Sequence, residues 1–124
     1  MSAEDNIANT KAAYAAFAAG DAVAAQAALA DEVEWIVPGN STLSGTYVGK
    51  EAVMGLWMAL LEKGFTTTPV DYFGNENRVV VLTTTTAAGE TGEAADVITF
   101  NGDQVVSFTS YGDTALQERI WGTK

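Results

Sequence analysis

The sequence contains neither cysteine nor histidine, and these two absences exclude several kinds of chemistry. Without cysteine the chain has no disulfide and no thiolate nucleophile. Without histidine it lacks the commonest general base and the commonest zinc ligand. Calcium-loop and phosphate-loop patterns are missing too, so we expect no metal ion and no cofactor. Any catalysis must then use carboxylates, Tyr, Lys, Arg or hydroxyl groups.

Positive charge is also scarce, with six Lys and Arg residues against sixteen Asp and Glu residues and a net charge of −10. An acidic surface repels nucleic-acid phosphates and anionic membranes, so we expect neither as a partner. No apolar run approaches the roughly 18 residues of a membrane-spanning helix. The N-terminal segment MSAEDNIANTK is too acidic and polar for a signal peptide, and we therefore expect a cytoplasmic protein.

The hydrophobic pattern of the 124 residues changes from a helical period to a period of two along the chain. The pattern predicts helices over 5–19, 22–29 and 50–63, and strands over 33–37, 66–74, 78–87, 93–101 and 104–111. The tail from Asp113 has room for one helical turn. Helices followed by an antiparallel meander indicate an α+β protein, and we expect a single domain over residues 1–124.

Four segments occur in an order and spacing that resembles a known superfamily. They are YAAFAAGD (14–21), ALADEVEWIVPG (28–39), LSGTYVGKEAV (43–53) and DVITFNGDQVVSF (96–108). The order resembles the NTF2-like superfamily and, within it, the SnoaL-like proteins related to ketosteroid isomerases. The resemblance implies a cone in which three N-terminal helices pack on a curved, mostly antiparallel β-sheet. It also implies that the Gly-rich stretch from Pro38 to Gly49 is a loop beside the mouth of the cone.

Asp96 is the strongest candidate for chemistry. In its strand, alternation places Asp96 on one face with Ile98 and Phe100. If that face is buried, loss of solvent raises the pKa of the carboxyl group, and a protonated acid can donate a hydrogen bond to a developing oxyanion. The resemblance aligns Asp96 with the oxyanion-hole aspartate of ketosteroid isomerases. The alternative is a structural aspartate that bonds a backbone amide or faces water.

The rest of the ketosteroid isomerase machinery is missing from the sequence. The general base of that family would precede the proline of the first strand, where this chain has Val37. The family's tyrosine would stand seven residues before the Gly-Asp pair, at Ala13, so we interpret Tyr14 as a core residue. Many SnoaL-like relatives carry a histidine where this chain has Ile36. A standard ketosteroid isomerase mechanism therefore lacks its proton shuttle.

The sequence also lacks residues that other reactions of the superfamily require. Limonene epoxide hydrolases use an Asp-Arg-Asp arrangement, whereas the corresponding strand reads Thr83–Thr86 and Ser110 replaces the second Asp. Polyketide cyclases use an Asp for proton transfer during aldol ring closure. Asp96 is one possible carrier. We expect Asp71 to lie at a solvated strand edge, and Asp113 to cap the last helical turn.

A set of apolar and aromatic residues is predicted to line a pocket, together with one hydroxyl group. The set is Trp35, Val37, Tyr47, Met54, Trp57, Met58, Phe108 and Ser110. Such a composition is typical of a site for an apolar small molecule. It is equally typical of an ordinary hydrophobic core.

Three classes of function stay open. The first is an isomerase or polyketide-cyclase-like enzyme that acts on a hydrophobic carbonyl compound with Asp96 as the acid. The second is a non-catalytic protein that binds an apolar small molecule. The third is a dimeric assembly module whose cone is filled by its own side chains. Because β-branched residues such as Thr83–Thr86 suit a sheet face, we expect a homodimer formed through the outer face of the sheet.

Overall fold

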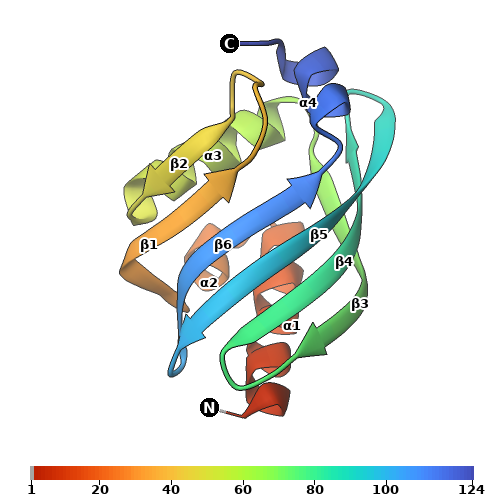
Figure 1. Cartoon of the computed structure of the whole chain (residues 1–124). Helices are drawn as coiled ribbons and strands as arrows, with labels where there is room; N and C mark the ends of the chain where they lie inside the picture. Colours follow the sequence, from red (N-terminus) through yellow and green to blue (C-terminus); the bar gives the residue numbers. More distant parts are fainter. Residues whose placement is uncertain (1) are drawn as a thin grey trace.

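A computed structural model describes residues 2–124 and shows helices packed on a single six-stranded sheet (Figure 1). The helices are α1 (Ala3–Ala18), α2 (Ala22–Ala25), α3 (Lys50–Glu62) and α4 (Thr114–Trp121). The strands are β1 (Leu29–Val37), β2 (Gly45–Val48), β3 (Thr66–Gly74), β4 (Arg78–Ala87), β5 (Glu90–Asn101) and β6 (Gln104–Gly112). In Figure 1, α1 and α2 lie behind the sheet, and α4 lies at one end of it beside the C-terminus.

The strand order in the sheet is β2-β1-β6-β5-β4-β3. Only β1 and β6 pair in parallel, and the other neighbours are antiparallel. Register shifts in β1, β3 and β5 interrupt the ladders, and irregularities of this kind bend a strand and increase its twist. The α+β architecture and the mostly antiparallel curved sheet agree with the sequence-based expectation.

Two helical predictions are wrong. The expected cap of three N-terminal helices is wrong because α3 follows two strands, and because a fourth helix, α4, comes after the last strand. The second helix was expected to reach residue 29 but ends at Ala25. Leu29 instead begins β1 and pairs with Val105 of β6. The sequence pattern could not show this pairing, because the partner lies far away along the chain.

The glycine-rich segment after β1 is more than a connector. Residues 45–48 form β2, which pairs with β1 through Trp35 and Tyr47. The backbone N–H of Thr42 donates to the carbonyl of Gly122 at 2.9 Å, and the Thr42 hydroxyl donates to the carbonyl of Trp121 at 2.8 Å. Gly39 has φ +100°, and a Cβ there would lie 2.9 Å from a side-chain carbon of Thr114. The segment is therefore tied to the C-terminal helix.

The core lies between the helices and the sheet face that they cover. Its fully buried aliphatic residues include Val33, Val53, Val79 and Val81. The polar residue Asn6 of α1 is also fully buried, and it donates from Nδ2 to two backbone carbonyls in the β3–β4 turn, at 3.2 and 3.0 Å. These bonds fix α1 against the sheet, and so fix the position of the side chains that α1 directs inward.

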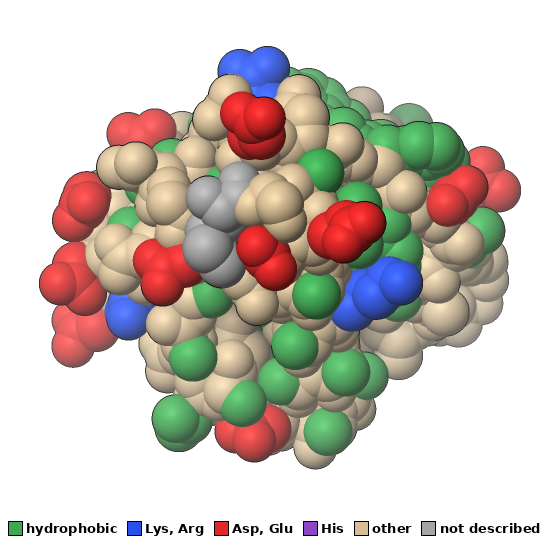
Figure 2. Space-filling view, turned by 90° about the horizontal axis from the view of Figure 1, so that it is seen from below, with side chains coloured by type: hydrophobic (Ala, Val, Ile, Leu, Met, Phe, Trp, Pro, Cys, Tyr) green, Lys and Arg blue, Asp and Glu red, His purple; other side chains and the backbone are tan. Residues whose placement is uncertain are grey.

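The outer surface is acidic, in keeping with the composition. Seen from the N-terminal end of α1, it carries many Asp and Glu side chains and few Lys or Arg side chains (Figure 2). Within residues 2–124, no helix is long and apolar enough to cross a membrane.

Candidate active and ligand-binding site

A cavity of about 170 Å³ lies inside the fold, and α1, α3, α4 and strands of the sheet all contribute to its lining. A single buried water needs roughly 10–15 Å³ on the same measure. The cavity is therefore large enough for a small organic molecule.

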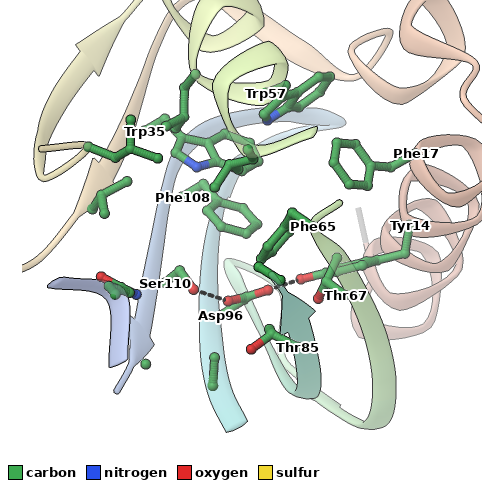
Figure 3. A pocket seen from close by; sticks show the side chains of 18 of the residues that line it. Tyr14, Phe17, Trp35, Trp57, Phe65, Thr67, Thr85, Asp96, Phe108 and Ser110 are labelled. Atoms are coloured by element: carbon green, nitrogen blue, oxygen red, sulfur yellow. Dashed lines mark hydrogen bonds between the residues drawn. The ribbon is translucent and has the colours of Figure 1, made fainter. Parts of the chain in front are cut away.

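Aromatic side chains form one wall of the cavity (Figure 3). Trp35 stacks on Phe108 with ring centroids 3.6 Å apart and an interplanar angle of 9°. These two residues are register partners on the parallel strands β1 and β6. Trp57 of α3 meets the edge of Trp35 at 5.5 Å, and Phe17 of α1 meets Trp57 at 5.4 Å. Each ring of the wall therefore contacts at least one other ring, in geometries that aromatic pairs prefer.

Asp96 lies opposite this wall and is 4% exposed. Its neighbours along the strand on the same face, Ile98 and Phe100, are buried as well, which confirms the orientation expected from the sequence. The Tyr14 hydroxyl donates to Asp96 Oδ2, and the Ser110 hydroxyl donates to Oδ1 at 2.6 Å (Figure 3). Asp96 and Ser110 face each other across β5 and β6. The two carboxyl oxygens are thus each held by one hydroxyl group.

Burial raises the pKa of the Asp96 carboxyl group above its ordinary value, while the hydrogen bonds from Ser110 and Tyr14 lower it in part. Burial, with the charge of Asp96 as a second cause, also raises the pKa of the Tyr14 hydroxyl. Tyr14 therefore stays protonated at neutral pH and serves as a donor. The site holds a desolvated carboxyl group with two hydroxyl donors.

Tyr14 packs against the hydrophobic core, as expected, but its hydroxyl group has a second role that the sequence did not predict. The ring does pack edge-on against Tyr72 at 6.5 Å, but the hydroxyl reaches Asp96. Ala13, the position that the family pattern favoured, also lines the cavity but carries no polar atom. One signal was available in the sequence: Tyr14 has the only polar side-chain atom in the stripe formed by Ile7, Tyr14 and Phe17.

Two threonines extend the polar side of the cavity. Thr67 of β3 and Thr85 of β4 are register partners, and both lie on the same side of the cavity as Asp96 (Figure 3). The Thr67 hydroxyl is buried and has no hydrogen-bond partner in the described part of the chain. The cavity therefore has an aromatic wall and a hydroxyl-rich wall that carries the carboxyl group.

Comparison with known proteins identifies the family. The SnoaL-like domain matches residues 10–108, which is most of the chain and includes Tyr14, Asp96 and the aromatic wall. The chain belongs to the SnoaL-like domain family. An uncharacterised protein of Mycobacterium tuberculosis is 28% identical to this SnoaL-like protein over 117 residues, which cover 87% of this chain and 89% of that protein.

Solved structures share the fold of the SnoaL-like protein. An NTF2-like protein from Burkholderia pseudomallei is 28% identical, with a TM-score of 0.85 and coverage of 94% of this chain and 97% of that one. Bal32a, from a soil-derived mobile gene cassette, has a TM-score of 0.89 at 23% identity, with coverage of 96% and 98%. TerC, co-crystallised with polyporic acid, has a TM-score of 0.85 at 21% identity, with coverage of 96% and 99%. These structures place the SnoaL-like protein in the NTF2-like superfamily.

The structure separates the predicted lining residues into two groups. Five line the cavity, namely Trp35, Val37, Trp57, Phe108 and Ser110. The other three, Tyr47, Met54 and Met58, do not line the cavity, so the prediction that they belong to its lining is wrong. Roles in ligand binding stay predictions for the first group.

Helix geometry and local bonding explain the three misplaced residues. Met58 is 64% exposed, because it follows Trp57 on α3 and so points about 100° away from it around the helix axis. Met54 packs against the hydrophobic core and is absent from the cavity lining. The Tyr47 hydroxyl donates to the carbonyl of Leu43 at 2.6 Å, which fixes the segment before β2.

Helix α4 contributes lining residues that the sequence analysis missed, because only one turn was expected there. They are Leu116, Gln117, Ile120 and Trp121. Asp113 caps this helix, with its carboxylate accepting from the backbone N–H of Leu116 at 3.0 Å, as predicted. The eight-residue length follows from contacts with β5 and with residue 42, which no local pattern reveals.

Asp96 is the only buried acid in the described cavity lining. Glu90 also belongs to the lining but pairs with Arg119 at 2.9 Å, and Glu93 and Asp113 are exposed. Val37 occupies the lining position where the resemblance would place a general base. Residues 2–124 contain no group of three or more acidic side chains arranged to hold a metal ion. Asp96, with its partners Tyr14 and Ser110, is therefore the one buried acidic group that the described cavity lining offers for acid–base chemistry.

Proposed function

We propose that this SnoaL-like protein binds an apolar carbonyl compound in its cavity and promotes enolisation of that compound, as an isomerase or cyclase does. The observation that carries the proposal is the buried Asp96 carboxyl group, held by Tyr14 and Ser110 and facing an aromatic wall. A desolvated acid in an apolar pocket with few polar groups is typical of a small-molecule site with a chemical role.

The proposed chemistry is stabilisation of negative charge on the carbonyl oxygen. Because burial raises its pKa, Asp96 can hold a proton and donate it in a hydrogen bond to that oxygen. When a proton leaves the adjacent carbon, the electron pair of the C–H bond moves to the C–C bond and the carbonyl π pair moves to the oxygen. With Val37 in place of a base, we assign the role of proton acceptor to water. The product is the enol or its conjugate base.

Exchange of carbon-bound hydrogen for deuterium tests this proposal directly. Acetophenone in D₂O exchanges its methyl hydrogens through its enol or enolate, so proton NMR follows enolisation without any knowledge of the natural substrate. We expect the protein to accelerate this exchange, and Asp96→Asn to reduce it by about 10²-fold, the lower end for one acid–base group. Asp71→Asn is the matched control, because Asp71 is an exposed acid whose carboxylate accepts only from the adjacent backbone N–H. Exchange that is as fast with Asp96→Asn as with the unaltered protein would refute the role of Asp96.

A second candidate is a non-catalytic binding protein for an apolar small molecule. The observation that favours it is the lack of a second buried acid among the described lining residues. TerC, which shares the fold, was co-crystallised with an organic acid, and this supports binding of organic molecules by the fold. Acetophenone that binds without exchange would favour this candidate. The open cavity counts against the third class, a cone filled by its own side chains.

A further inference from the structure

Two polar side chains of α4 are left without partners at the cavity. Gln117 and Trp121 both line it, and the Gln117 Oε1 and Trp121 Nε1 atoms are buried with no hydrogen bond in the described chain. A buried polar atom without a partner destabilises the fold, because it has lost its hydrogen bonds to water and gained none in return. Two such atoms on one element therefore call for an explanation beyond packing.

The two atoms are an acceptor and a donor on the same helix face. Residues 117 and 121 are four apart, and side chains at that spacing are neighbours on a helix surface. Helix α4 is firmly held, since Asp113 caps its start and the Thr42 hydroxyl donates to the Trp121 carbonyl at 2.8 Å. The unpartnered atoms consequently belong to an anchored element rather than to a frayed end.

The Gln117 amide lies a short way along the sheet from the Asp96 carboxyl group. A Cβ on Gly112 would be 3.3 Å from Gln117 Nε2, so the amide sits over Gly112. Gly112 is two residues beyond Ser110, the register partner of Asp96, on the same strand. At about 3.3 Å per residue, the two polar points are roughly 7 Å apart along β6. This separation is close to the span of one aromatic ring with a substituent at each end.

We propose that Gln117 and Trp121 form a hydroxyl-binding subsite, and that the ligand carries a hydroxyl group across an apolar body from its carbonyl group. A hydroxyl donates one hydrogen bond and accepts others, so it can donate to Gln117 Oε1 and accept from Trp121 Nε1. The subsite rests on the proposed function, because it assumes that the carbonyl group of the ligand lies at Asp96. It narrows the ligand class to compounds such as para-hydroxyaryl ketones.

The test compares two probes that differ by one hydroxyl group, acetophenone and 4-hydroxyacetophenone. Dissociation constants are measured by NMR titration of the nitrogen-15-labelled full chain, and Trp121→Phe assigns the Trp121 indole N–H signal. We expect 4-hydroxyacetophenone to bind about 2- to 10-fold more tightly, which corresponds to the net value of a hydrogen bond. We also expect it to move the Trp121 indole signal downfield, while acetophenone does not.

Variants then test the two side chains. The measured quantity is the dissociation constant of acetophenone divided by that of 4-hydroxyacetophenone, and a ratio above one means that the hydroxyl group strengthens binding. Gln117→Met and Trp121→Phe should each bring the ratio close to one, and the ratio within one protein cancels any general loss of affinity. Glu118→Gln is the matched control, because Glu118 lies on α4 but outside the cavity lining. A ratio that stays above one in either variant overturns the two-residue subsite, as does a ratio of one in the unaltered protein.

The failure of the subsite can be told from the failure of the proposed function. If both probes bind equally and the protein still accelerates the exchange of acetophenone in D₂O through Asp96, the subsite is wrong and the role of Asp96 stands. Equal binding also follows if a water molecule bridges Gln117 and Trp121 and stays there, and that result overturns the subsite in the same way. If neither probe binds, the ligand site itself is wrong and the subsite falls with it.

Discussion

Tyr14 of α1 donates its hydroxyl hydrogen to Asp96 of β5, although 82 residues separate them in the sequence. The bond joins the helical layer to the sheet inside the cavity, and it makes Tyr14 part of the environment that sets the pKa of Asp96. The hydrogen bonds that fix Asn6 to the β3–β4 turn hold α1 in the position that allows this contact.

Removing the Tyr14 hydroxyl should raise the pKa of Asp96 further. A hydrogen bond to a carboxylate favours the charged form, and Tyr14→Phe deletes one of two such bonds. The carbon-13 signal of the Asp96 carboxyl group, assigned with Asp96→Asn, should titrate at a higher pH in Tyr14→Phe than in the unaltered protein. Tyr72→Phe is the matched control, since the Tyr72 hydroxyl makes no hydrogen bond with Asp96. An unchanged or lower midpoint in Tyr14→Phe would contradict the prediction.

Asp96 should make the protein less stable as the pH rises. The pKa of Asp96 is raised in the folded state, whereas in the unfolded chain it is about 3.9. At pH values between these two pKa values, the folded state binds more protons than the unfolded state. The contribution of Asp96 to the free energy of unfolding is thus greatest below about pH 3.9 and is lost as the pH rises through the folded pKa.

Asp96→Asn isolates this contribution. At pH 8 we expect the variant to be more stable than the unaltered protein by about 1 kcal/mol, which is within the range of single stabilising substitutions. The advantage should shrink as the pH falls below the folded pKa. Urea unfolding of both proteins between pH 3 and 8 measures the difference. Asp71→Asn should show no comparable pH dependence, and an advantage that grows toward low pH would contradict the assignment.

Gly92 should be required for α4 to pack on β5. A Cβ at this position would lie 2.7 Å from Leu116 Cδ2, closer than carbon atoms approach, so Gly92→Ala must displace the Leu116 side chain. Because Leu116 is buried, we expect that displacement to move the helix as well. We expect a loss of about 1–3 kcal/mol in the free energy of unfolding, as for overpacked cores. Amide hydrogen exchange of residues 116–121 should become faster. Thr91→Ala, at the exposed neighbouring position, should leave α4 exchange unchanged. Equal exchange in both variants would mean that Leu116 yields without moving the helix.

We propose that the outer sheet face forms a homodimer. Val70, Leu82 and Tyr111 on three strands are 69%, 41% and 58% exposed and line a shallow outer groove. Sedimentation should give about twice the chain mass of 13.0 kDa, and Leu82→Glu with Tyr111→Glu should give monomers because buried unpaired charges are costly. Val23→Glu is the control, since Val23 is 76% exposed on α2. A monomer mass for the unaltered protein would reject the dimer.

The strands β3 and β4 could be predicted to the residue, because their alternation and turn residues are local signals. The same alternation placed Asp96 on the face of Ile98 and Phe100, and that face is buried. Local signals also predicted the cap at Asp113. The sequence by itself therefore determined the fold class, the principal strands and the most promising acidic residue.

Tertiary structure decided which distant residues meet. Strand β2 and the early start of β1 depend on pairing with each other and with β6, and the length of α4 depends on contacts with Gly92 and Thr42. The Tyr14 hydroxyl reaches Asp96 only because α1 has a particular position on the sheet and a particular rotation about its own axis. Side-chain packing between the helix and the sheet sets both, and helical periodicity does not. Periodicity assigns a residue to a face, whereas the partner on the opposing face follows from how whole elements pack.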